Sequence, residues 1–125
     1  MPSSAQVAEA FFDAWTGKDF DRARTLVHAD ISFEGPFDSF SDADSYLASL
    51  AQLSQVVTGA EKQKIFEDGE DVCVIYELKT SPVPSSRVCE WLRVRDGKVA
   101  SISAVFDPRP FVPLFEAGHA ERGRP

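Results

Sequence analysis

Residues 71–106 read DVCVIYELKTSPVPSSRVCEWLRVRDGKVASISAVF, and this stretch decides the fold class. Apolar and polar side chains alternate through it, and β-branched and aromatic residues are frequent, which is typical of strands with one buried face. Pro82-Val83-Pro84 and Asp96-Gly97 interrupt the alternation with turn residues. The pattern predicts an antiparallel meander, whose strands, with one earlier run included, are Glu61–Glu67, Asp71–Thr80, Ser86–Arg95 and Val99–Phe106.

Helical periodicity replaces this alternation near the start of the chain. Apolar residues recur every three or four positions from Val7 to Trp15, which predicts a helix that ends at Gly17. The side chain of Asp19 can then accept a hydrogen bond from the first turn of a second, shorter helix. We expect that second helix to end at Asp30.

A short strand and a third helix complete the first half of the chain. Ile31–Glu34 alternates as a strand, and Gly35-Pro36 ends it because proline cannot donate a hydrogen bond to a neighbouring strand. Ser41 and Asp44 have the spacing of a capping box, which predicts a third helix from there to about Thr58.

Helices followed by strands, with short connections, indicate an α+β domain. We predict a curved antiparallel sheet that forms a cone, with three N-terminal and central helices packed on its concave face. A chain of 125 residues is the length of one domain, so residues 1–125 are assigned to a single unit with its core at about 5–107. The proline-rich tail, residues 108–125, is expected to lie extended on a surface.

The alternation also assigns side chains to the two faces of the sheet. Glu90 and Leu92 share one face of the sheet with Ile102. Glu90 is the single charged residue on this face, and the other residues there are apolar: Val88, Val94, Ala104 and Phe106. A two-residue turn at Asp96-Gly97 would pair Glu90 with Ser103, whereas a three-residue turn pairs it with Ile102. The better apolar match favours the three-residue turn.

A symmetric turn about Val83 would place Tyr76 directly opposite Glu90, so that a phenol and a carboxyl meet inside the cone. The same register separates Cys73 from Cys89 by four residues along the strands, or about 13 Å, which is too far for a disulfide. We therefore expect two reduced thiols that do not bridge.

Composition excludes several classes of partner. The formal net charge is −7 and the pI is about 4.7, so an acidic surface would repel nucleic acid and anionic membranes. The sequence has no apolar run long enough to span a membrane and no N-terminal signal pattern, which favours a cytoplasmic protein. Neither metal-ligand spacing nor a phosphate-binding loop is present, and we expect no metal and no cofactor.

The chain resembles the nuclear transport factor 2-like (SnoaL-like) superfamily. The residues that carry the resemblance are Val7–Trp15, Gly17–Phe20, Phe33–Pro36, Phe66–Gly69 and Leu92–Val99, and the match spans about 5–107. The resemblance implies a cone of sheet and helices around an apolar pocket. It does not imply one activity, because the superfamily includes ketosteroid isomerases, polyketide cyclases, epoxide hydrolases, dehydratases and proteins without catalysis.

Transfer of functional residues from these relatives retains little of their chemistry. The position of the isomerase base is Gly35, the position of its oxyanion-hole tyrosine is Phe11, and only its second acid has a counterpart, at Glu90. The acid of the SnoaL-type cyclases falls near Ala104. The inward faces carry no arginine for the Asp-Arg-Asp site of the epoxide hydrolases.

Three hypotheses follow for function. The first is a protein that binds a small apolar molecule with a carbonyl or hydroxyl group. The second is an isomerase, cyclase or hydratase in which Glu90 is the general acid or base. The third is a non-catalytic interaction module that forms a homodimer through the outer face of the sheet, near Ile75, Cys89 and Trp91. Besides Glu90, the candidate ligand-binding residues are Tyr76, Phe11, Trp15, Phe33, Leu92 and Phe106.

Overall fold

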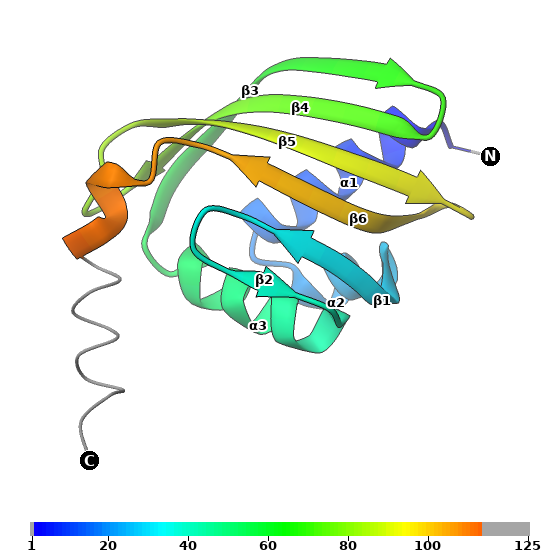
Figure 1. Ribbon diagram of the computed structural model, residues 1–125, viewed down its shortest axis with the longest axis horizontal. Coiled ribbons are helices and arrows are strands. Elements are labelled where there is room, and N and C mark those ends of the chain that lie inside the picture. The colour runs from blue at the N-terminus through cyan, green and yellow to red at the C-terminus, as the bar shows by residue number, and fades with distance from the viewer. Residues whose placement is uncertain (1, 114–125) are drawn as a thin grey trace.

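One twisted sheet curves over three helices, which pack against its concave face (Figure 1). The computed structural model describes residues 2–113. Its helices are α1 (Ser4–Thr16), α2 (Phe20–Thr25) and α3 (Ala43–Ser54). Its strands are β1 (Val27–Glu34), β2 (Ser39–Phe40), β3 (Val57–Asp68), β4 (Asp71–Thr80), β5 (Ser86–Arg95) and β6 (Lys98–Val105), and a short 3-10 helix, η1 (Arg109–Phe111), follows. The predicted α+β cone is confirmed.

The sheet is mixed rather than wholly antiparallel. The strand order is β2-β1-β6-β5-β4-β3, and β1 runs parallel to β6 while every other neighbouring pair is antiparallel. The predicted antiparallel meander is therefore correct for β3 to β6. The parallel pair joins segments about 70 residues apart, a long-range contact that no local alternation records.

The first residues of α1 and α3 differ from the prediction, and capping side chains determine both. α1 begins three residues before Val7, because the Ser3 side chain accepts a hydrogen bond from the Gln6 amide and the Gln6 side chain accepts one from the Ser3 amide. α3 begins after Asp42 rather than Ser41, because the Asp42 carboxylate accepts a hydrogen bond from the Ser45 amide at 2.8 Å. Asp19 caps α2 as predicted.

α2 and α3 end earlier than predicted, and the strands that follow them begin within the predicted helices. α2 stops at Thr25 instead of Asp30, and α3 stops at Ser54 instead of Thr58. β1 therefore begins at Val27 and β3 at Val57. The two-residue strand β2 lies between the predicted first strand and the predicted third helix, and it pairs with the end of β1.

The predicted registers of both hairpins are wrong, although the face of each side chain is right. Asp96 and Gly97 both have positive φ and form a two-residue turn. One extra residue of β6 then bulges out between the partners of Val94 and Arg93, so Glu90 lies opposite Ala104. In the β4–β5 hairpin, Tyr76 lies opposite Val88 and not opposite Glu90. Each register differs from its prediction by two residues, and an even shift leaves the buried face unchanged.

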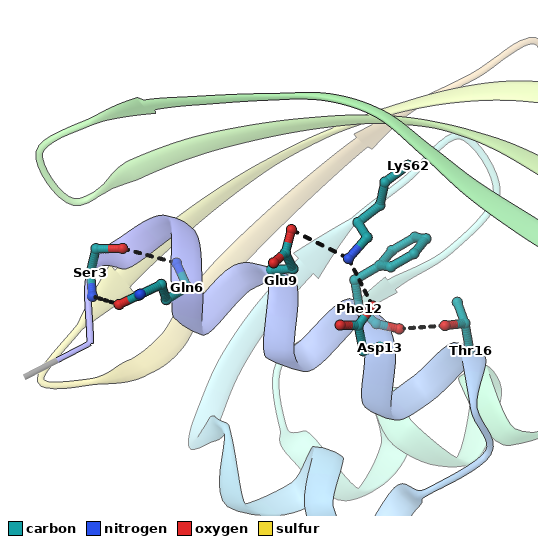
Figure 2. A network of polar contacts seen from close by, with 7 residues as sticks. All are labelled: Ser3, Gln6, Glu9, Phe12, Asp13, Thr16 and Lys62. Atoms are coloured by element: carbon teal, nitrogen blue, oxygen red, sulfur yellow. Dashed lines mark hydrogen bonds and ion pairs between the residues drawn. The ribbon is translucent and has the colours of Figure 1, made fainter.

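Polar contacts fix α1 to the edge strand β3 (Figure 2). The Lys62 ammonium donates to Asp13 at 2.9 Å, lies 3.3 Å from Glu9, and sits over the ring of Phe12. Burial lowers the pKa of Lys62, but its hydrogen bonds to Asp13 and Glu9 outweigh that effect, so the pKa is raised. This network holds the helix against the sheet at the edge where β3 has only one neighbouring strand.

The segment after β6 turns instead of lying extended. Arg109–Phe111 form the 3-10 helix η1, so the prediction of an extended tail is wrong for this part. Phe111 is buried and packs edge-on against Phe106, with ring centroids 5.4 Å apart. Residues 114–125 of the predicted tail lie outside the described residues. Among the described residues, no helix is long and apolar enough to cross a membrane.

Candidate functional site

Among residues 2–113, Glu90 is the one acidic or basic side chain in the buried core, and it is only 8% exposed. It sits on the concave face in a cross-strand row between Val74 of β4 and Ala104 of β6, with Ile65 of β3 next to Val74. All three neighbours are apolar. Burial therefore raises the pKa of Glu90 from 4.5 to about 7, although a hydrogen bond from Tyr76 opposes this rise.

Two buried tyrosines accompany this carboxyl. Tyr76 lies one row away on the neighbouring strand and hydrogen-bonds Glu90, and Tyr46 comes from α3 on the opposite side of the core. Burial, followed by the charge of Glu90, raises the pKa of both phenols well above the usual value, so both keep their protons. A carboxyl that titrates near neutrality and two permanent donors thus lie in one apolar environment.

Aromatic contacts connect several predicted wall residues to these tyrosines. Phe33 stacks on Tyr46 with ring centroids 4.7 Å apart, and Phe11 lies 6.3 Å from the same ring. Phe12 packs edge-on against Tyr76 at 4.9 Å, and it also contacts Trp15. These contacts form one cluster between α1, α3, β1 and β4.

The other two predicted wall residues lie apart from this cluster. Leu92 is 2% exposed and sits in the next row of the sheet, between Val72 and Ile102. Phe106 is only partly buried and belongs to a second aromatic group with Phe37 and Phe111. The six predicted ligand-binding residues therefore lie in more than one place in the fold.

Tyr46 belongs to the site although the sequence did not predict it as a site residue. It lies within the predicted third helix, where it touches Phe11, Phe33 and Phe40 and interacts electrostatically with Glu90. A polar-tipped aromatic residue in an otherwise aliphatic helical stripe, beside Leu47 and Leu50, is the signal that could have identified it.

Two hollows stand out in the described structure, and Glu90 lines neither of them. One, of about 690 Å³, lies largely on the outer face of the sheet, where Trp91 and Arg93 of β5 face serines of β1, β2 and β6. The other, of about 280 Å³, lies between the end of α1 and the start of β3. The side chains around Glu90 are packed against one another, with exposures of 2–4% for Phe11, Tyr46 and Tyr76.

The chemistry available at this site is that of a proton donor and acceptor. In the described part of the chain, no group of three or more His, Cys, Asp or Glu side chains is placed to hold a metal ion. The buried side chains of residues 2–113 include no arginine. A neutral Glu90 can donate a hydrogen bond or a proton to an oxygen atom, and an ionised Glu90 can accept one.

The sequence pattern of the SnoaL-like domain matches residues 8–102, so the chain belongs to the SnoaL-like family. The family membership inferred from the sequence is confirmed. No curated protein matches the chain in sequence.

Solved structures show the same architecture. A protein from Kribbella flavida DSM 17836 is 30% identical, with a TM-score of 0.84 over 93% of this chain and 96% of that chain. An NTF2-like protein of unknown function from Cytophaga hutchinsonii ATCC 33406 is 21% identical, with a TM-score of 0.79 over 90% of this chain and 96% of that chain. An LEH-like epoxide hydrolase from M. tuberculosis is 20% identical, with a TM-score of 0.74 over 97% and 96%. The last two similarities show the fold alone.

Proposed function

We propose that this protein binds a small, largely apolar molecule with a carbonyl or hydroxyl group, between the helices and the concave face of the sheet. Glu90 is the polar anchor. The observation that carries the proposal is the burial of this carboxyl in an apolar row, because an ionisable group there destabilises the fold and such groups concentrate at functional sites.

The surroundings of Glu90 suit a ligand oxygen. With a pKa of about 7, a substantial fraction of the carboxyl is protonated at neutral pH and can donate a hydrogen bond to a carbonyl. The Tyr76 phenol donates a hydrogen bond to this carboxyl. Phe11 and Phe33, which pack on Tyr46, would supply apolar contacts for the rest of the ligand.

Access to Glu90 requires movement of a side chain, and the β1–β2 hairpin is the part of the wall best suited to move. β2 contributes only two paired residues, Ser39 and Phe40. Phe33 and Phe40 are partly buried, in contrast to the fully buried Phe11 on α1. Displacement of the Phe33 ring from its stack on Tyr46 would open a path to the tyrosines and to Glu90.

The test is a thermal-shift screen that compares apolar ketones and alcohols with hydrocarbons of the same size and shape. The proposal predicts that ketones or alcohols raise the unfolding temperature more than their hydrocarbon partners do. Replacement Glu90→Leu removes the hydrogen bond and fills the site with an apolar side chain, so it should abolish this preference. The exposed Glu70→Gln is the matched control. Binding without a preference for oxygen, or no binding by any member of the series, would contradict the proposal.

A second candidate function is proton transfer at carbon, with Glu90 as general acid or base in an isomerase, cyclase or hydratase. The same pKa near 7 favours it, because a group that titrates near the working pH transfers protons most efficiently. Exchange of the α-protons of a bound ketone for deuterium, followed by NMR, detects such chemistry directly. Replacement Glu90→Gln should abolish enzyme-dependent exchange, and exchange at the wild-type rate in that variant would exclude this assignment.

A third proposal concerns assembly: a second copy of this chain covers the outer face of the sheet. Phe66 and Trp91 are each 54% exposed on this face, and Val105 is 65% exposed. Two ion pairs within the chain border the same patch, Arg87 with Glu77 and Arg93 with Asp71, and a two-fold-related copy would place equivalent pairs beside them. Light scattering should report twice the 13.8 kDa mass of one chain. Trp91→Glu should return a monomer, and a wild-type monomer at all working concentrations would exclude the assembly.

A further inference from the structure

The two cysteines are neighbours on the outer face of the sheet. Their sulfur atoms lie 3.2 Å apart, which contradicts the separation of about 13 Å expected from the sequence. The expected register was wrong by two residues: Cys73 lies opposite Trp91, and Cys89 lies opposite Ile75, so the two cysteines are diagonal neighbours on adjacent strands. Both thiols are free and only partly buried.

This geometry requires little change to form a covalent bond. A disulfide has a sulfur separation of about 2.05 Å, so the two sulfur atoms, now 3.2 Å apart, must approach by roughly 1.2 Å. Cys73 lies on β4 and Cys89 on β5, and eight residue pairs join these two strands, which fixes the relative positions of the cysteines. We propose that Cys73 and Cys89 form a reversible intramolecular disulfide by exchange with a low-molecular-weight disulfide such as oxidised glutathione.

The exchange balances in two steps. The thiolate of one cysteine attacks a sulfur atom of oxidised glutathione, the disulfide bond breaks, and one glutathione leaves with the electron pair. The sulfur of the second cysteine then attacks the mixed disulfide and expels the second glutathione. Two cysteine thiols are oxidised, one disulfide is reduced to two glutathione thiols, and the two protons pass from the cysteines to the departing thiolates.

The position of the pair links its oxidation state to the candidate site. The diagonal from Cys73 to Cys89 crosses the Val74–Glu90 pair, whose side chains point to the opposite, concave face. A disulfide between Cys73 and Cys89 would join β4 to β5 next to the Val74–Glu90 pair, which carries the buried carboxyl. In the reducing cytoplasm expected from the sequence, the thiols stay free until the glutathione pool becomes oxidised. The disulfide does not depend on the proposed ligand, and it forms in the dissociated chain, because a second copy over the outer face would keep glutathione from the two thiols.

The test uses the whole chain, incubated with oxidised glutathione and then measured by intact mass spectrometry under non-reducing conditions. Burial, and then the contact with Cys89, raise the pKa of Cys73 to about 11. The exchange is therefore run at about pH 8.5, where thiolate is more abundant. Wild-type protein should lose two hydrogen atoms and stay a single chain. Cys73→Ser and Cys89→Ser lack the resolving thiol, so each should instead retain one glutathionyl group.

A second measurement follows the consequence for the fold. The new bond would close a loop between residues 16 positions apart, so oxidation should raise the thermal unfolding midpoint of the wild type by roughly 5 °C or more. Dithiothreitol should reverse the shift, and neither serine variant should show it. A wild-type chain that stays unmodified, retains glutathionyl groups, or becomes a disulfide-linked dimer would overturn the proposal.

Discussion

Replacement of Glu90 by glutamine should change how stability depends on pH. The folded chain raises the pKa of Glu90 from 4.5 to about 7, chiefly through burial. Below the lower value the carboxyl is protonated in both the folded and the unfolded chain, and no charge is buried. As the pH rises toward 7, the unfolded chain loses this proton while the folded chain keeps it, so wild-type stability falls. Above 7 the folded chain contains a buried carboxylate and the loss becomes constant.

The magnitude follows from the two pKa values. Their difference of about 2.5 corresponds to about 3 kcal/mol of unfolding free energy, which the wild type loses between about pH 4 and pH 8. Glutamine has nearly the same shape and cannot ionise, so Glu90→Gln should escape this loss. Urea unfolding of both proteins at the two pH values measures the difference, and Glu70→Gln, at an exposed site, controls for charge alone. A change of less than about 1 kcal/mol in the wild-type-minus-variant difference would refute the buried-acid account.

Two further predictions test the framework that positions the site. Lys62→Ala removes the contacts that hold α1 on β3. Urea unfolding should show that the free energy of unfolding falls by about 1 kcal/mol or less, because Glu9 and Asp13 are half exposed. Lys98→Ala, at an exposed position, is the control and should leave the free energy of unfolding unchanged. Gly97→Ala should cost about 1 kcal/mol because φ at this position is +75° while nothing within 4 Å obstructs a methyl group. Gly59→Ala, at a position without positive φ, is its control. Equal losses in a variant and its control would remove the physical reason given for that variant.

The sequence predicted what depends on local periodicity. Alternation identified β4 and β5 to the residue and placed Glu90 on the buried face, because burial of one face imposes the same period on the side chains. Helical spacing identified all three helices. The faces survived even though both hairpin registers were wrong, since each error was an even number of residues.

The rest depended on contacts that no local pattern records. Val27 and Val57 fit both a helical face and the start of a strand, so the chain alone could not show where α2 and α3 stop. The approach of Tyr46 to Glu90 requires α3 to fold back across the sheet, and the parallel pairing of β1 with β6 joins the two halves of the chain. The distance between the thiols was wrong because it depends on the exact register rather than on the face.

The central claim is that Glu90 is a buried acid that titrates near neutrality and holds a ligand oxygen. The most direct measurement is a ¹³C NMR titration of its carboxyl carbon, assigned by comparison with Glu90→Gln, with and without the tightest-binding ketone of the screen. The account predicts a midpoint of about 7 that moves upward when the ketone is bound, because the ketone accepts a hydrogen bond only from the protonated acid. A midpoint near 4.5 that the ketone does not move would contradict it.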